Sequence, residues 1–411
     1  MPAREAASPC FGILAGEPSG DMLGAGLMQA LLARYPNARF VGVGGVRMQA
    51  LGLRSIVPIE QLSVHGFTQP LLRLPRLLQI FRAVRRQVLA ARALAFIGVD
   101  FNVFNLLLER SLKRTGLPTV HYVSPSVYAW RRGRIGRIAR SADLLLALFP
   151  FEPALYAGTP LRVVYVGHPL ADELVGTADR QGARNALRAM GSLQRLDVHA
   201  SAVGMQSHAP LRAAALNAVL VPVIALLPGS RVSEVQLMGQ LFVQAARLVR
   251  VVEPQAHFVV PCVNASVRRL MQRVVDAADA HSWIELLDGA SRLAMSAADV
   301  VLVKSGTGTL EALLLERPMV VAYKLGYVTA AIVRRLIRTP FVGLPNILAG
   351  RLAVPELLQE NATPGKLAAA LLQVLRHGDQ AARDLQPIAQ SLRCGASQRG
   401  AQAVLELVGM R

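Results

Sequence analysis

Short apolar runs alternate along this chain with longer segments whose apolar residues recur every three or four positions. The runs at residues 11–15, 40–44, 95–100, 118–123, 144–148 and 162–166 are predicted to be buried strands. The segments between them, such as the one that ends near Leu32, are predicted to be helices. Because strand and helix alternate, the pattern indicates an α/β protein with parallel sheets.

The same alternation begins again in the second half, with predicted strands at residues 221–227, 257–261, 283–287, 300–303 and 318–323. Residues 191–219 show no strong period. We therefore expect an N-terminal domain over residues 1–175, a linker with an insertion over 176–219, and a C-terminal domain over 220–378. The amphipathic tail, residues 379–411, is expected to be helical and to pack back on the N-terminal domain.

Two glycine turns in the second half join a strand to a helix: residues 305–308 (Ser-Gly-Thr-Gly) and 228–231 (Pro-Gly-Ser-Arg). Free N–H groups and the positive end of a helix make such turns anion sites, typically for phosphate. Arg231 could clamp a phosphate, and Glu311 could accept two sugar hydroxyls. Alternatively, Ser305 and Thr307 only cap the helix and Glu311 only complements its dipole.

Other polar residues lie at predicted strand ends and turns. Asp100 ends a strand, where the carboxyl edge of a parallel sheet faces the ligand crevice, although it could also cap the next helix. His168 could orient a ligand or be structural. Trp130 could be a platform for a sugar or part of the core. Residues 341–350 are expected to form a loop in which Asn346 reads a base or ribose, or caps its own turn. Residues 354–359 are expected to begin a helix.

Charge narrows the choice of partner. The 411 residues carry a net charge of +19, which suits nucleic acid, anionic lipid or phosphorylated substrates, or reflects only a bias toward arginine. Aromatic residues make up only 5%, and no nucleic-acid module is recognisable, so nucleic acid is disfavoured. Residues 62–86 combine arginines with apolar residues at helical spacing. That pattern is typical of a helix on a membrane surface, or equally of an ordinary helix that covers a sheet.

Hydrophobic residues make up 53% of the chain, yet no run reaches the roughly 18 uncharged apolar residues of a membrane span. Residues 1–10 lack the apolar core of a signal peptide. Cys10, Cys262 and Cys394 are odd in number and far apart, which argues against a disulfide framework and a metal cluster. A cytoplasmic protein is therefore expected. The glycine clusters near residues 24–26 and 42–44 do not fit a dinucleotide fingerprint.

Short motifs follow one another in a fixed order along nearly the whole chain outside residues 191–219. They lie at residues 15–21 (Ala-Gly-Glu-Pro-Ser-Gly-Asp), 44–48, 62–67, 121–131, 149–152, 166–168, 225–234, 305–311, 344–346 and 355–359. Each is weak alone, but in this order the chain resembles the lipid-A-disaccharide synthase family.

The resemblance implies a B-type glycosyltransferase fold, in which two Rossmann-like domains with parallel sheets face a cleft. It implies an inverting enzyme that joins UDP-2,3-diacylglucosamine to 2,3-diacylglucosamine 1-phosphate (lipid X), giving a β-1,6-linked lipid A disaccharide 1-phosphate and UDP for lipopolysaccharide synthesis. No metal or other cofactor is expected. Since both substrates are acylated, a peripheral protein on the cytoplasmic face of the inner membrane is expected, and a homodimer is left open.

The motifs also imply roles for single residues. Asp100 is the expected general base that takes the proton of the acceptor's 6-hydroxyl, with Glu17 as the alternative base. The diphosphate of UDP is expected to bind Arg231 and the backbone near Ser230, Ser305, Gly306 and Thr307. Glu311 is expected to bind the ribose and Asn346 the uracil side. The expected substrate-binding set is completed by Ser19, Trp130 and Gln359.

Three positions depart from the family pattern. Val103 stands where a second carboxylate is usual, His65 replaces a methionine, and Val46 replaces a proline. Two alternatives stay open. One is another UDP-sugar enzyme of the same fold, such as a UDP-N-acetylglucosamine 2-epimerase or a peptidoglycan transferase. The other is a membrane-surface or nucleotide-binding module without catalysis.

Overall fold

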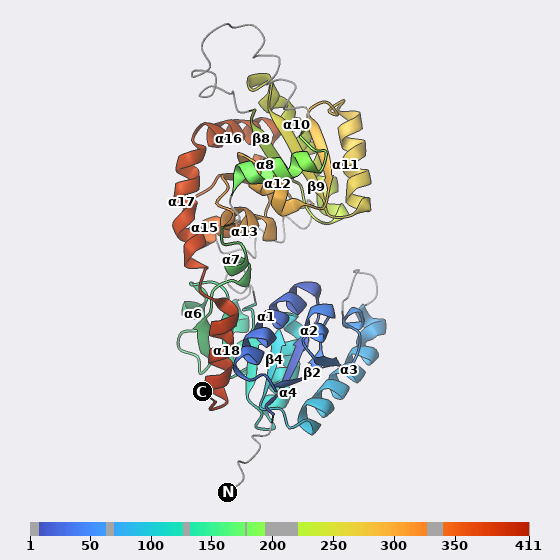
Figure 1. Cartoon of the computed structure of the whole chain (residues 1–411), viewed down its shortest axis with the longest axis vertical. Coiled ribbons are helices and arrows are strands. Elements are labelled where there is room, and N and C mark those ends of the chain that lie inside the picture. The colour runs from blue at the N-terminus through green and yellow to red at the C-terminus, as the bar shows by residue number, and fades with distance from the viewer. Residues whose placement is uncertain are drawn as a thin grey trace. The chain divides into compact units, whose positions relative to one another are not determined.

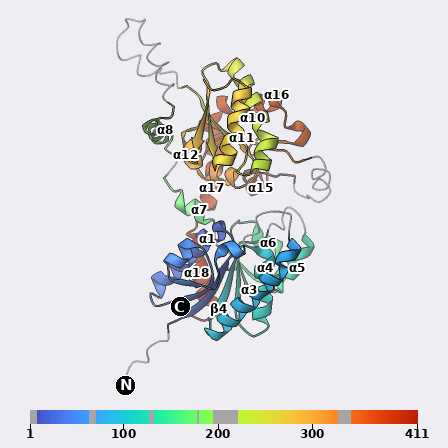
Figure 2. The same ribbon diagram turned by 90° about the vertical axis from the view of Figure 1, so that its right-hand side faces the viewer.

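The computed structural model describes residues 8–62, 70–125, 132–176, 179–193, 221–326 and 340–410. The chain divides into two compact units: unit 1 contains Met1–Glu173 with Ser391–Arg411, and unit 2 contains Leu174–Gln390. Each unit is a parallel sheet flanked by helices (Figures 1 and 2). The predicted parallel α/β class is therefore confirmed.

Among its described residues, unit 1 has a seven-stranded sheet in the order β3-β2-β1-β4-β5-β6-β7. The strands are β1 (Cys10–Ala15), β2 (Arg39–Val43), β3 (Leu53–Ser55), β4 (Ala95–Val99), β5 (Thr119–Tyr122), β6 (Leu144–Ala147) and β7 (Arg162–Tyr165). The helices are α1 (Pro18–Arg34), α2 (Val46–Ala50), α3 (Pro70–Ala90), α4 (Asn102–Lys113), α5 (Ile135–Ala139), α6 (Glu152–Leu155), α7 (Pro169–Glu173) and α18 (Ala396–Leu407).

Among its described residues, unit 2 has a six-stranded sheet in the order β10-β9-β8-β11-β12-β13. The strands are β8 (Val223–Leu227), β9 (His257–Cys262), β10 (Ile284–Asp288), β11 (Val300–Lys304), β12 (Met319–Tyr323) and β13 (Glu356–Leu358). The helices are α8 (Arg180–Ala189), α10 (Val232–Val252), α11 (Ala265–Ala277), α12 (Ser291–Ala297), α13 (Thr307–Leu314), α15 (Leu344–Ala349), α16 (Pro364–Arg376) and α17 (Gly378–Ser391).

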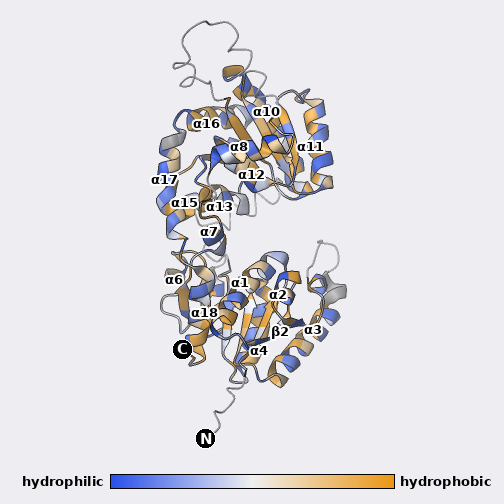
Figure 3. Cartoon of the chain, viewed as in Figure 1, coloured by the Kyte–Doolittle hydropathy of each residue, from blue (hydrophilic) through white to orange (hydrophobic). Residues whose placement is uncertain are grey.

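The central strands are buried because helices cover both faces of each sheet. In unit 1, alternate residues of β1 face opposite cores: Ile13 packs with α1 and α18, and Leu14 packs with α3 and α4. A fully buried side chain of this size contributes about 1.5–3 kcal/mol. Figure 3 shows apolar strands inside each unit and helices that are polar on one side only.

The C-terminal helix α18 packs on α1 within unit 1. The carboxylate of Asp172 accepts hydrogen bonds from the N–H groups of Gly395 and Ala396, at 3.0 and 2.6 Å. The N–H of His168 donates to the carbonyl of Leu392 at 2.9 Å. The motif around His168 therefore fastens the chain's return to unit 1.

Two local predictions were wrong. Residues 356–358 form the edge strand β13, paired with β12, where a helix was expected. The expected loop at 341–350 contains the helix α15. At residues 356–358, pairing with β12 overrides the local signal for a helix. At the start of α15, the Glu356 carboxylate accepts hydrogen bonds from the N–H groups of Val342 and Gly343 and so stabilises the helix. None of the described helices is long and apolar enough to cross a membrane.

Candidate functional site

The strand order of each sheet reverses at one point, and ligands of open parallel sheets bind at the carboxyl ends of the strands there. In unit 1 the reversal lies between β1 and β4, and in unit 2 between β8 and β11. Glu17 follows β1 and Asp100 follows β4. The two predicted catalytic carboxylates therefore lie at the switch point of unit 1.

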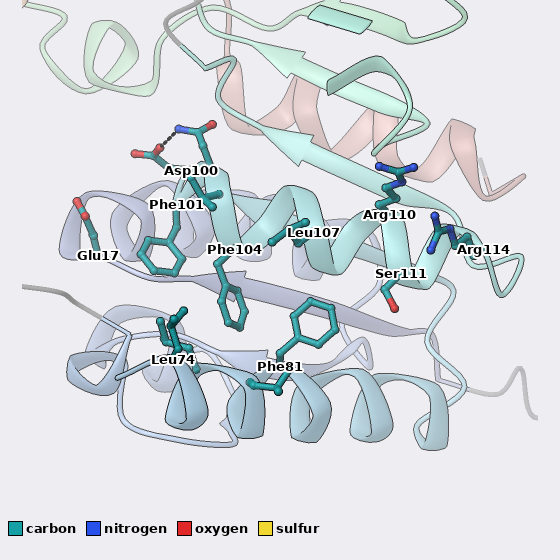
Figure 4. A pocket seen from close by; sticks show the side chains of 14 residues that line it. Glu17, Leu74, Phe81, Asp100, Phe101, Phe104, Leu107, Arg110, Ser111 and Arg114 are labelled. Atoms are coloured by element: carbon teal, nitrogen blue, oxygen red, sulfur yellow. Dashed lines mark hydrogen bonds between the residues drawn. The ribbon is translucent and has the colours of Figure 1, made fainter. Parts of the chain in front are cut away.

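Glu17 and Asp100 line one cavity of about 940 Å³ (Figure 4). The rest of its wall comes from α3 and α4 and is mostly apolar. Leu74, Leu78, Val103 and Leu107 remain 55, 47, 71 and 58% exposed there. Large apolar side chains gathered around a hollow mark an interaction site. Farther along α4, Arg110 and Arg114 line the same cavity (Figure 4).

The backbone at Asp100 is strained. Asp100 and Phe101 have φ values of +48° and +46°, and a left-handed residue other than glycine costs about 1–3 kcal/mol. The buried Asn105 amide stabilises this turn, because its Nδ2 donates to the carbonyls of Leu14, Val99 and Asp100 at 3.3, 3.2 and 2.8 Å. One oxygen of the Asp100 carboxylate, Oδ1, accepts a hydrogen bond from Asn102 Nδ2 at 3.1 Å (Figure 4).

The polar residues of the motif at residues 15–21 have different roles. Glu17 is exposed at the N-cap of α1, and Ser19 is exposed in the first turn but does not line the cavity. Asp21 is buried, and its carboxylate accepts hydrogen bonds from the N–H groups of Gly45, Arg47 and Met48, so it holds the start of α2. Trp130 and His65 lie outside the described residues.

In unit 2, a second cavity of about 600 Å³ lies at the β8–β11 switch point. Six of the predicted substrate-binding residues line it, from the loops after β8 and β11 and from α13. They are Ser230, Arg231, Ser305, Gly306, Thr307 and Glu311. Glu311 also lies 3.6 Å from Arg292 Nε.

The turn at residues 305–308 is open toward this cavity. Gly306 is the N-cap of α13 with φ of +153°, which favours glycine, and a side chain there would meet empty space. The N–H groups of Gly306, Thr307 and Gly308 have no acceptor within the described ranges. Ser305 does not cap the helix, because its hydroxyl donates to the carbonyl of Val342 at 3.1 Å.

The turn at residues 228–231 is different. The N–H groups of Ser230 and Arg231 donate to Glu234 Oε2 at 3.0 and 3.3 Å. The expectation that this backbone binds the diphosphate is therefore corrected: Glu234 already occupies it. The side chains of Ser230 and Arg231 remain exposed and line the cavity.

Lys304, the last residue of β11, was missed by the sequence reasoning. Its Nζ lies 2.8 Å from Glu234 Oε1 and lines the same cavity. Burial raises the pKa of Glu234, but the hydrogen bond and charge of Lys304, with two backbone N–H groups, outweigh it and lower the pKa. The pair therefore presents a fixed ammonium group beside the open turn.

The structure also corrects the role of Asn346. This side chain is fully buried, its Nδ2 donates to Val354 O and Glu356 Oε1, and its Oδ1 accepts from the N–H groups of Ala353 and Val354. Its hydrogen-bonding capacity is used within unit 2, so it cannot contact uracil here. Gln359 is half-buried, and its Oε1 accepts from the N–H of Leu325 at 3.3 Å.

Two further motif residues are structural. Burial lowers the pKa of His168 to about 4, against the opposing effect of Asp172, and its Nδ1 accepts the N–H of Leu170. Burial raises the pKa of Glu152 to about 7, partly offset by hydrogen bonds that include the N–H of Phe149. No group of three or more His, Cys, Asp or Glu side chains that could hold a metal ion occurs in the described part of the chain.

Comparison with known proteins gives one family. The model of the lipid-A-disaccharide synthetase family matches residues 11–193 and 207–407. The lipid-A-disaccharide synthase of Azotobacter vinelandii is 46% identical over 396 residues, covering 96% of this chain and 97% of the relative. The corresponding enzyme of Pseudomonas aeruginosa PAO1 is 45% identical over 399 residues, covering 97% and 98%.

Solved structures show the same fold at low identity. A UDP-forming α,α-trehalose-phosphate synthase from Burkholderia vietnamiensis has a TM-score of 0.59 at 12% identity, covering 97% of each chain. A UDP-N-acetylglucosamine 2-epimerase from Neisseria meningitidis, bound to UDP-GlcNAc, has a TM-score of 0.57 at 10% identity, covering 97% of this chain and 98% of that one.

Proposed function

The chain belongs to the lipid-A-disaccharide synthase family, and from this premise we propose how its two cavities carry out the transfer. The protein is a glycosyltransferase of lipid A biosynthesis. Its donor is UDP-2,3-diacylglucosamine, and its acceptor is 2,3-diacylglucosamine 1-phosphate. The products are lipid A disaccharide 1-phosphate and UDP.

The cavity of unit 2 is the donor site. The diphosphate accepts hydrogen bonds from the N–H groups of residues 306–308 at the positive end of α13, and Lys304 and Arg231 add positive charge beside them. Glu311, in the second turn of the same helix, accepts the ribose hydroxyls. Donors fixed in this way stabilise the negative charge that develops on departing UDP.

The cavity of unit 1 holds the acceptor and the base. The oxygen of the acceptor's 6-hydroxyl attacks the anomeric carbon of the donor, the bond from that carbon to the UDP oxygen breaks, and UDP leaves with the electron pair. The hydroxyl proton passes to Asp100. Since Asn102 binds Oδ1, the oxygen that takes the proton is Oδ2, which has no partner within the described ranges. The configuration at the donor carbon inverts.

The apolar wall between α3 and α4 binds acyl chains. Four large side chains of that wall are about half exposed or more, and they lie beside the predicted base in one hollow. Arg110, Arg114 and the net charge of +19 favour an anionic lipid surface. We therefore place the enzyme at the cytoplasmic face of the inner membrane as a peripheral protein.

The observation that carries this mechanism is Asp100, held at the switch point of unit 1 beside an acyl-sized apolar cavity. The test is UDP release from the two acylated sugars by the wild type and by Asp100→Asn. Loss of the base lowers kcat about 10²–10⁴-fold, while the Kd for UDP stays unchanged because UDP binds unit 2. Glu17→Gln is the matched control, and a loss confined to it would move the role of base to Glu17.

A wild-type enzyme that releases no UDP from this pair of sugars would overturn the proposal. Epimerisation of UDP-N-acetylglucosamine by the same sample would then support the epimerase alternative. Binding of UDP with neither reaction would support a nucleotide-binding module.

A further inference from the structure

Behind Asp100 lies a buried row of side chains that the proposed mechanism does not use. Glu109 on α4 and His121 on β5 are both fully buried, and Glu109 Oε1 lies 2.7 Å from His121 Nδ1. His121 Nε2 lies 3.1 Å from Asn102 Oδ1. The same Asn102 amide donates to Asp100 Oδ1 at 3.1 Å. The four side chains thus connect the core of unit 1 to the predicted base.

Stability alone does not account for this pair. Burying two ionisable groups costs more than burying apolar residues of the same volume, and Glu109 Oε2 has no hydrogen-bond partner within the described ranges. The strand also makes room for it: a Cβ on Gly98 would lie 2.1 Å from Glu109 Oε1. A pair that is costly to bury, and for which a strand gives up a side chain, suggests a role beyond packing.

The hydrogen bonds fix where the protons are. A 2.7 Å contact between Glu109 Oε1 and His121 Nδ1 contains one proton, whichever atom carries it. The Asp100 carboxylate must be ionised to act as a base and can then only accept hydrogen bonds, so it faces the NH₂ group of Asn102. Asn102 Oδ1 therefore faces His121 Nε2, and that nitrogen carries a second proton. Burial raises the pKa of Glu109, while the charge and hydrogen bond of His121 lower it. The pair is neutral overall, as imidazolium with carboxylate or as imidazole with carboxylic acid.

This proton arrangement permits only one orientation of the Asn102 amide. Rotating the amide by half a turn would place Oδ1 against the Asp100 carboxylate and the NH₂ group against the Nε2 proton. One acceptor would then face another acceptor, and one donor would face another donor. The Asp100 carboxylate at one end and the Nε2 proton at the other therefore favour the same orientation of the Asn102 amide.

We propose that Glu109, His121 and Asn102 are positioning residues for the transfer, which fix the Asp100 carboxylate so that Oδ2 points to the acceptor hydroxyl. This inference rests on the proposed role of Asp100 as the base. None of the three residues takes the proton itself. Asp100 is left with one carboxylate oxygen bound and one free, on a backbone already held by Asn105.

Two substitutions of His121 separate positioning from packing. The amide nitrogen of a glutamine lies near the position of Nε2, so His121→Gln can still donate to Asn102. The amide of an asparagine lies near Nδ1, so His121→Asn keeps a polar group beside Glu109 but does not reach Asn102. Both variants replace the same buried ring by an amide, so their cost to folding is similar.

Misplacing the base costs up to about 10²-fold in rate. We therefore expect His121→Asn to lower kcat about 10–100-fold, while His121→Gln stays within about threefold of the wild type. The KM for the acceptor and the Kd for UDP should not change in either variant. Asn102→Ala, at a half-buried position in the first turn of α4, should reproduce the kcat loss without touching the buried pair.

The other possible results distinguish failure of the positioning role from failure of Asp100 as the base. Equal losses in His121→Gln and His121→Asn, or a normal kcat in Asn102→Ala, would overturn the positioning role. If Asp100→Asn is inactive while His121→Asn keeps the wild-type kcat at an unchanged melting temperature, only the further inference fails. If Asp100→Asn stays active, the proposed base is wrong whatever the His121 variants do.

Discussion

The exposed leucine side chains of the unit 1 cavity allow us to predict how much the apolar wall contributes to acceptor binding. Leu107 is 58% exposed and Leu78 is 47% exposed, on opposite helices of the cavity. Full burial of a leucine side chain contributes about 1.5–3 kcal/mol. Covering about half of each side chain with an acyl chain therefore contributes about 1 kcal/mol, which is about fivefold in affinity.

Leu107→Ser and Leu78→Ser should each raise the KM for the acylated acceptor about fivefold, and the double variant about 25-fold if the two sites act independently. The kcat should be unchanged, because neither side chain reaches the reacting atoms in the proposed mechanism. The measurement is initial UDP release in mixed micelles, with the acceptor varied at a fixed ratio to detergent. A deacylated acceptor, which cannot use the wall, should show no difference between wild type and variants.

Leu248→Ser is the matched control, because Leu248 is 42% exposed on α10 of unit 2 and lines neither cavity. An equal rise in KM for this variant would mean that any lost surface leucine weakens interaction with the micelle. An unchanged acceptor KM in the double variant would remove the acyl-chain role of the wall.

Three further predictions concern single groups. Glu152 has a folded pKa of about 7 against an unfolded value of 4.5, so the stability it contributes is fully present below pH 4.5 and is lost as pH rises through about 7. Glu152→Gln should remove that loss and make the protein more stable than wild type at pH 8 by about 3 kcal/mol in urea unfolding. His168 has a folded pKa of about 4 against an unfolded value of 6.5, so the stability it contributes is present above pH 6.5 and is lost as pH falls toward 4. His168→Asn should therefore reduce the fall in the free energy of unfolding between pH 6.5 and pH 4. Gly306→Ala should weaken UDP binding about tenfold or more by calorimetry, since an alanine disfavours a φ of +153° and its methyl group points into the cavity.

The sequence predicts the fold and the place of both cavities for a physical reason. Buried parallel strands are continuous apolar runs, so their ends are visible in the sequence. Once strands and helices alternate, the polar residues after β4 and β11 must lie at a carboxyl edge. Asp100 and the turn at residues 305–308 were found in this way.

The partners of polar side chains that lie farther away along the chain were not predictable. Glu234 Oε1 pairs with Lys304, 70 positions away, while its Oε2 caps the N–H groups of Ser230 and Arg231 in the neighbouring turn. Asn346 turns inward to Val354 and Glu356. Both turns carry the same glycine signal, but at residues 228–231 the local cap formed by Glu234 takes up the N–H groups that stay free at residues 306–308. The apolar cavity likewise exists only because α3 and α4 pack side by side on one face of the sheet.

Some of the strained turns of this chain line the cavities proposed to bind substrate. Arg92, Asp279 and Glu316 have positive φ values two residues after α3, α11 and α13, where a left-handed residue commonly ends a helix. Asp100, Phe101, Val123, Ala290 and Gln359 instead follow strands. Asp100 and Phe101 line the cavity of unit 1 and Ala290 lines that of unit 2, whereas Val123 and Gln359 line neither. Since each left-handed residue other than glycine costs about 1–3 kcal/mol, other contacts must stabilise the turn at Asp100. The Asn105 amide supplies them beside the cavity where the acceptor is proposed to bind.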